Sequence, residues 1–238
     1  MIRPPIGIVA GSGLDLHDIL DCAVMNLPFD NFPGLIPSSV DGHEGAFIHG
    51  TCRDIPIIIQ SGRLHFYEGL DYDTVVRPVD VLHETGVRTI VFTNAAGALD
   101  PDLQPGDLVA ATSVGAWPFV GWPDRPNTLQ TDFTVPECDH LGQYMWVHGP
   151  SYETPAEIAV LREMGGMVVG MSAAPEVHRA QALGMRAAVI SCVTNVCGSD
   201  ETINHEDVVT VAEQSSRQLR NLLAHWISAF AGKTESPD

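Results

Sequence analysis

Gly62-Arg63-Leu64-His65-Phe66-Tyr67-Glu68-Gly69 follows the apolar run Ile55-Pro56-Ile57-Ile58-Ile59-Gln60, which has the composition of a buried strand. If the stretch is extended, Arg63, His65 and Tyr67 share one face, because alternate side chains of an extended chain point the same way. Arginine carries a planar, permanent charge that suits phosphate or carboxylate. The stretch therefore predicts an oxyanion site where a strand ends. The alternative is a chance polar run in an exposed loop.

Apolar strand-like runs alternate with helical patterns along the rest of the chain. This alternation predicts one α/β domain over residues 1–231, with a central mixed, mostly parallel β-sheet flanked by helices, and a flexible tail over 232–238. Residues 93–98 resemble a small-residue turn, and 115–136 an irregular loop. Strands are expected at 6–10, 46–50, 55–60, 88–92, 108–112, 144–148, 167–170 and 186–194. Helices are expected at 14–20, 74–84, 155–164 with Thr154 as the N-cap and Pro155 as the first residue, 173–183 and from 205.

Composition excludes several classes of protein. The formal net charge is −18 and Lys233 is the only lysine, so we expect neither nucleic acid nor an anionic membrane as a partner. No apolar run is long enough to span a membrane, and the N-terminus lacks the pattern of a signal peptide. Five cysteines without metal-ligand spacing favour a reducing compartment, and we expect the protein to be cytoplasmic.

Polar or glycine-rich motifs follow most of the strand-like runs, at the strand ends where ligands collect in α/β sheets. In chain order with the opening stretch, from residue 6 to about 228, they resemble the trimeric purine nucleoside phosphorylase family. The motifs are Gly11-Ser12-Gly13, Gly42-His43-Glu44-Gly45, Thr93-Asn94-Ala95-Ala96-Gly97, Gly149-Pro150-Ser151-Tyr152-Glu153-Thr154, Val169-Gly170-Met171-Ser172 with Pro175-Glu176, Thr194-Asn195 and Asn204-His205-Glu206.

The resemblance implies phosphorolysis of purine nucleosides in purine salvage, in which phosphate attacks the anomeric carbon and yields free base and ribose 1-phosphate. It also implies a homo-oligomer, expected to be a trimer, and no metal or organic cofactor. By the same resemblance, phosphate is held by Ser12, His43, Arg63, His65, the backbone N–H of Ala96 and Ser172, ribose by Tyr67, Met171 and His205, and the base by Tyr152, Glu153 and Asn195, with His65, Glu153 and Asn195 as catalytic residues.

The choice of base is assigned to two residues. The carboxylate of Glu153 accepts hydrogen bonds from N1–H and from the 2-amino group of guanine. The amide of Asn195 donates to O6 and accepts from N7–H as charge builds on the leaving purine. Relatives that use 6-aminopurines carry an aspartate here, so the resemblance implies 6-oxopurine nucleosides: inosine, guanosine and their deoxy forms.

Other interpretations remain open at this point. Ser12 and Ser172 are also suited to capping helices, His43 to ordering its own loop, and His205 to starting a helix without touching a ligand. The segments 113–143 and 196–204 are shorter than the family pattern, so a catalytically weak nucleoside-binding homologue is one alternative. A methylthio-nucleoside phosphorylase is the other, although the polar His205 argues against it.

Overall fold

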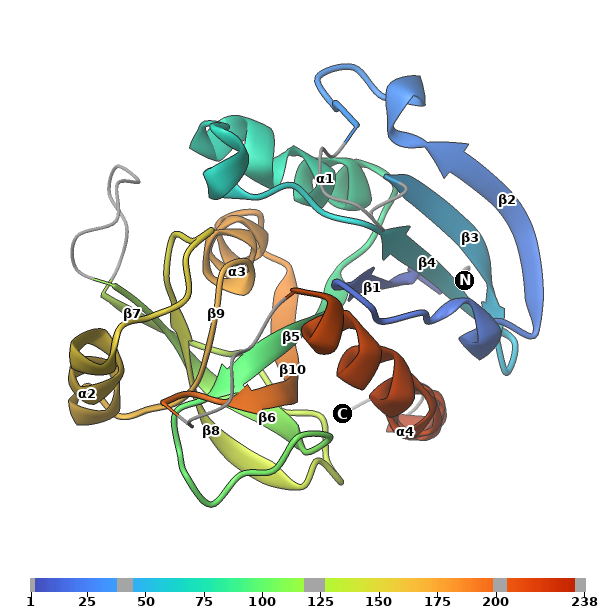
Figure 1. The fold of residues 1–238 in the computed structure, drawn as a ribbon. Helices are drawn as coiled ribbons and strands as arrows, with labels where there is room; N and C mark the ends of the chain where they lie inside the picture. The colour runs from blue at the N-terminus through green and yellow to red at the C-terminus, as the bar shows by residue number, and fades with distance from the viewer. Residues whose placement is uncertain (1–2, 38–44, 118–126, 199–204, 234–238) are drawn as a thin grey trace.

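The computed structural model describes residues 3–37, 45–117, 127–198 and 205–233 (Figure 1). The strands are β1 (Ile6–Ala10), β2 (Cys22–Pro28), β3 (Ala46–Cys52), β4 (Ile55–Ser61), β5 (Thr89–Ala98), β6 (Leu108–Ala116), β7 (Thr128–Gln130), β8 (His140–Trp146), β9 (Gly166–Gly170) and β10 (Arg186–Val196). The helices are α1 (Tyr72–Glu84), α2 (Pro155–Glu163), α3 (Ala173–Ala182) and α4 (His205–Lys233), with short 3-10 turns η1 (His17–Ile19), η2 (Phe29–Asn31) and η3 (Phe66–Glu68).

One sheet organises the fold, and β5 is its central strand. The sheet runs β10-β6-β8-β9-β5-β1-β4-β3-β2, and β10 also pairs with β5, so five of the strands close into a ring. The pairings of β1 with β4 and β5, of β10 with β5, and of β8 with β6 and β9 are parallel. The other five described pairings are antiparallel, which makes the sheet evenly mixed rather than mostly parallel.

Helices cover the two faces of this sheet. Figure 1 shows α1 and α3 side by side on one face and α4 on the other. Along β1, Val9 belongs to the apolar core beneath α1 and α3, whereas Ile8 belongs to the core beneath α4. This alternation is the period of two expected of a strand buried on both faces.

Local sequence signals explain where two of the helices begin. The side chain of Asp71 accepts a hydrogen bond from Thr74 N at 2.9 Å and caps α1. The expected start of α2 is confirmed, because Thr154 is its N-cap, Pro155 its first residue, and Glu157 completes the capping box. Capped starts at these points leave residues 62–70 and 149–154 as connections at the sheet edge.

Two expectations about local structure are wrong, and one strand was not predicted. Residues 93–98 are not a turn, because β5 continues through Ala98 by pairing with β9 and β10. Strand β2 was not expected; its side chains are mostly exposed, so the sequence lacks the alternation of a half-buried strand. Residues 14–20 contain only the 3-10 turn η1 instead of a helix.

Several expected features fall outside the described residues. These are His43 and residues 118–126 of the expected loop between 115 and 136; the described remainder of that loop includes the end of β6 and the strand β7. Helix α4 begins at His205, but the side chain of that residue is not described, and α4 continues to Lys233 within the expected tail. Among the described residues, no helix is long and apolar enough to cross a membrane.

Candidate active site

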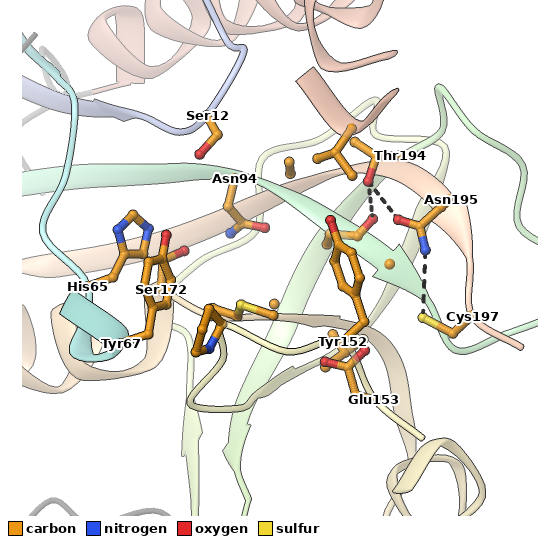
Figure 2. Close-up of a pocket in the computed structure, with 18 of the residues that line it drawn as sticks. Ser12, His65, Tyr67, Asn94, Tyr152, Glu153, Ser172, Thr194, Asn195 and Cys197 are labelled. Atoms are coloured by element: carbon orange, nitrogen blue, oxygen red, sulfur yellow. Dashed lines mark hydrogen bonds between the residues drawn. The ribbon is translucent and has the colours of Figure 1, made fainter. Parts of the chain in front are cut away.

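A cavity of about 380 Å³ lies where β1, β4, β9 and β10 end, beside the second half of β5 (Figure 2). Ten of the twelve predicted site residues are on its wall. Its lining is Ser12, Arg63, His65, Tyr67, Asn94, Ala95, Ala96, Gly97, Pro150, Tyr152, Glu153, Val169, Gly170, Met171, Ser172, Thr194, Asn195, Cys197 and Val208.

Arg63 is held rigidly at one end of the cavity. Its side chain is 1% exposed, Nε donates to Glu176 Oε1 at 3.0 Å, and Nη1 donates to the carbonyl of Thr93 at 2.9 Å. A Cβ atom at Gly11 would lie 3.1 Å from Nη1 and 2.8 Å from the Thr93 carbonyl oxygen. Glycine at position 11 therefore allows the loop after β1 to pass close to the guanidinium.

His65 and Tyr67 do reach the same pocket, but not as an extended segment. The 3-10 turn η3 begins at Phe66, and the two rings stack with centroids 4.7 Å apart and planes 16° apart. Glu68 accepts a hydrogen bond from the backbone N–H of His65 at 2.7 Å and fixes this turn. The opening stretch is thus a pocket wall rather than an exposed loop.

Burial sets the protonation of these two side chains. It lowers the pKa of His65, an effect partly opposed by the hydrogen bond to Glu68, so the imidazole is neutral at pH 7 in the empty pocket. Burial raises the pKa of Tyr67 to about 12. The phenol therefore keeps its proton and is a hydrogen-bond donor at neutral pH.

Two serines lie on the wall near Arg63 without capping a helix. The first helical turn after Ser12 begins only at His17, and its N-cap is Leu16. Ser172 stands at the N-cap position of α3, but its side chain makes no capping hydrogen bond. Its backbone N–H donates to the buried hydroxyl of Tyr144 at 3.2 Å. The capping interpretation is thus excluded for Ser172, and Ser12 does not cap the turn η1 that follows it.

A bulge in β10 places Asn195 at the other end of the cavity. The register between β10 and β5 shifts between Val193 and Asn195, which changes the direction of the side chains that follow. The hydroxyl of Thr194 donates to Asn195 Oδ1 at 3.0 Å, and Asn195 Nδ2 lies 4.0 Å from Cys197 Sγ (Figure 2). These two contacts orient the amide.

Tyr152 and Glu153 close the same end from the connection before α2. Tyr152 is 46% exposed, which leaves its ring face accessible to a planar ligand. Burial raises the pKa of Glu153, and the nearby Glu157 adds to this shift. A planar ring, a carboxyl and an amide thus lie together, and these groups can stack on a heteroaromatic base and form hydrogen bonds to it.

Comparison with known proteins shows the family to which the chain belongs. The sequence profile of the phosphorylase superfamily matches residues 5–228. Purine nucleoside phosphorylase 1 of Bacillus subtilis (strain 168) is 36% identical over 89% of this chain and 87% of its own. The chain belongs to the purine nucleoside phosphorylase family. The family member of Mycobacterium tuberculosis (strain ATCC 25618 / H37Rv) is 33% identical over 94% of this chain and 89% of its own.

Solved structures of this family share the fold. The Schistosoma mansoni purine nucleoside phosphorylase in complex with adenosine superposes with a TM-score of 0.82, at 32% identity, over 100% of this chain and 92% of that one. The complex of the same enzyme with inosine gives 0.81 at 30% identity, with the same coverage. The expectations of a mixed α/β sheet and of this family are confirmed.

Two predicted site residues, His43 and the side chain of His205, lie outside the described residues, although Val208 one turn later in α4 reaches the cavity. Sequence reasoning assigned no role to Asn94, Thr194, Cys197 or Glu176. A polar residue inside the apolar run of β5 was the available signal for Asn94. Nothing in the sequence marked Cys197.

Among the described residues, no group of three or more His, Cys, Asp or Glu side chains is arranged to hold a metal ion.

Proposed function

We propose that this protein catalyses the phosphorolysis of 6-oxopurine nucleosides. A phosphate oxygen forms a bond to the anomeric carbon while the bond from that carbon to N9 of the purine breaks. The purine leaves with the electron pair and takes up a proton from solvent, giving free base and ribose 1-phosphate or its deoxy form. The proposal is carried by one observation: Arg63, His65 and Asn195 line a single cavity, in which His65 and Asn195 lie on opposite sides (Figure 2).

The phosphate end is supported by its donors. The buried guanidinium of Arg63 is oriented by Glu176 and Thr93, so little freedom is lost when an anion binds. Ser12 and Ser172 supply hydroxyl groups, and the N–H of Ala96 lies on the same wall. In a chain of net charge −18, this local set of donors is what favours an anionic nucleophile. The hydroxyl of Tyr67 and the wall at Met171 suit the ribose between the two ends.

The base end supports a 6-oxopurine. Asn195 Oδ1 has two lone pairs, of which the Thr194 hydroxyl uses one, so one is left to accept from N7–H. Nδ2 has two hydrogens; one faces Cys197 and the other suits the O6 oxygen of a 6-oxopurine. The ring of Tyr152 suits stacking, and Glu153 accepts from N1–H. The hydrogen bond that Nδ2 donates to O6 strengthens as negative charge develops on the leaving base.

The remaining parts of the proposal rest on family resemblance. We propose a homotrimer, acting in purine salvage in the cytoplasm without metal or organic cofactor. All five cysteines, which the structure describes, are free thiols, in keeping with a reducing compartment. Size-exclusion chromatography with light scattering tests the trimer, and activity that persists in EDTA after dialysis tests the lack of a metal requirement.

The deciding experiment measures base release with and without phosphate. Inosine, guanosine, adenosine and methylthioinosine are compared at equal concentration. We expect phosphate-dependent release of hypoxanthine and guanine, with adenosine a poor substrate. A preference for methylthioinosine would assign the alternative methylthio-nucleoside activity. No cleavage of any nucleoside would leave a binding protein and refute the enzymatic proposal.

A further inference from the structure

Asn94 has an unusual environment for a polar residue in the middle of a sheet. It belongs to β5, is 2% exposed and lines the cavity. Neither Nδ2 nor Oδ1 has a hydrogen-bond partner among the described residues. Leaving a buried amide without partners lowers the stability of a folded protein, so such a group in a native site calls for an explanation.

The neighbours of Asn94 do not supply the missing partners. The hydroxyl of Thr93, one residue earlier, already donates to the carbonyl of Val9 at 2.8 Å. Ser191 lies opposite Asn94 on β10, yet its hydroxyl is not bonded to Asn94 and has no partner among the described residues either. The two groups differ in one respect: Asn94 lines the cavity, whereas Ser191 does not.

Asn94 lies between the two ends of the site. A Cβ atom at Gly11 would lie 2.8 Å from the Asn94 Cα and 3.1 Å from Arg63 Nη1, so Asn94 and the guanidinium are neighbours. Figure 2 shows the Asn94 side chain with Ser12 and Ser172 on one side and Thr194 on the other. The amide is recessed in the wall and faces the middle of the cavity, where the phosphate and the sugar of the proposed reaction would meet.

The chemistry of an amide assigns its two atoms to different ligands. The phosphate dianion has three unprotonated oxygens and one P–OH group, and the oxygens that face the Arg63 guanidinium are acceptors, so they satisfy Nδ2 and not Oδ1. Oδ1 needs a donor, and the donors that a nucleoside offers beside its anomeric carbon are ribose hydroxyl groups. We propose that Asn94 bridges the two substrates, with Nδ2 donating to phosphate and Oδ1 accepting from a ribose hydroxyl. This inference rests on the proposed function.

Two consequences follow from a bridge of this kind. Each substrate binds more tightly when the other is present, because only the ternary complex satisfies both atoms of the amide. The same amide destabilises the ligand-free protein, so its removal raises or maintains stability while it lowers activity. A residue that merely supported the sheet would show the opposite pattern.

Asn94→Leu tests the bridge because leucine keeps the shape of asparagine without its polar atoms. The matched control is Ser191→Ala, which removes a buried hydroxyl without a described partner from the opposing strand but away from the cavity. The readouts are the melting temperature of each ligand-free protein, kcat/KM for inosine, and inosine affinity with and without sulfate, used as an unreactive mimic of phosphate. Asn94→Ala provides a second variant in case leucine does not pack.

For Asn94→Leu we expect an unchanged or higher melting temperature, a fall in kcat/KM of about 30-fold or more, and loss of the sulfate effect on inosine affinity. Ser191→Ala should keep wild-type kinetics and sulfate response. The inference is overturned if both Asn94 variants melt at lower temperature without ligand, or if they keep wild-type kinetics. Failure of the wild-type protein to release base would instead refute the proposed function, and the ligand-free melting data would still report on the amide.

Discussion

Arg63 Nε donates to Glu176 Oε1 at 3.0 Å, and the two residues are 1% and 2% exposed. Glu176 does not line the cavity, so it acts on a ligand through the residues that do, chiefly Arg63. A charge buried this deeply without a counter-ion is strongly destabilising. The pair therefore keeps a cation inside the protein and ready for an anion.

Glu176→Ala should lower the free energy of unfolding by about 3–5 kcal/mol in phosphate-free buffer, because Arg63 loses its buried counter-charge. Phosphate should recover part of this loss and raise the stability of the variant more than that of the wild type. Urea unfolding with and without phosphate measures both effects. Asp80→Asn, which breaks the more exposed pair with Arg179, is the control; it should cost about 1 kcal/mol or less and respond to phosphate like the wild type. Equal phosphate responses in all three proteins would refute this account.

Asn195→Asp should shift preference from inosine toward adenosine. The carboxylate has no donor for O6, so it repels a 6-oxopurine, whereas it accepts from an exocyclic amine. We expect the ratio of kcat/KM for inosine to that for adenosine to fall about 100-fold or more, as when a buried polar contact is lost or reversed. The KM for phosphate serves as the internal control and should change little. An unchanged ratio would remove Asn195 from base selection.

Protonation of Glu153 should lower the activity on inosine at acid pH, which gives the pH profile an acid limb. Burial raises its pKa above the ordinary 4.5, and the carboxylate form is the one that accepts from N1–H. The profile of kcat/KM against pH should therefore fall at a pH above 4.5, and Glu153→Gln should abolish that limb along with most of the activity. A limb that persists in the variant would belong to another group.

The raised pKa of Glu153 also affects the stability of the fold, and for stability the ionised form is the unfavourable one. Because the folded-state pKa is above the unfolded one, ionised Glu153 destabilises the fold at pH values above both pKa values, and this cost disappears as pH falls below them. Glu153→Gln should thus raise the melting temperature at pH 7 and have little effect at pH 4. Melting curves at both pH values decide the matter; a lower melting temperature at pH 7 would contradict it.

Gly97→Ala should weaken nucleoside use through Asn195. A Cβ atom at Gly97 would lie 2.6 Å from Cys197 Sγ and 3.3 Å from Asn195 Nδ2, so the thiol and the amide must move. We expect kcat/KM for inosine to fall about 10-fold or more, as for loss of one hydrogen bond to a developing charge. The double variant Gly97→Ala, Cys197→Ala should recover part of the loss because it frees space. Lack of recovery would show that the backbone, rather than the thiol, transmits the change.

The sequence predicted the site better than the local structure around it. Arg63, His65 and Tyr67 converge as expected, although they do so through the turn η3 instead of an extended segment. Convergence depends on where the parallel strands end, and their apolar runs made those ends recognisable. The shape of the connection depends on contacts such as that of Glu68 with the His65 backbone, which sequence periodicity does not report.

The wrong predictions share one cause, which is the pairing of strands that are distant from each other in the sequence. Ala95, Ala96 and Gly97 are small residues typical of a turn, but partners on both sides hold them in β5. Glu176 and Asn94 were not assigned roles because their roles depend on which strand or helix lies opposite. The capped helix α2, by contrast, was predicted within a residue at each end, since its signals are local.

The bulge between Val193 and Asn195 separates two tasks within one strand. Before the bulge, β10 keeps its register with β5, whose residues Asn94 to Gly97 line the cavity; after the bulge, the side chains no longer follow that register. A substitution at position 195 should therefore alter the contacts at this end of the cavity without disturbing the pairing of β10 with β5 before the bulge. One irregular step in the strand thus lets the two parts of the cavity wall change independently.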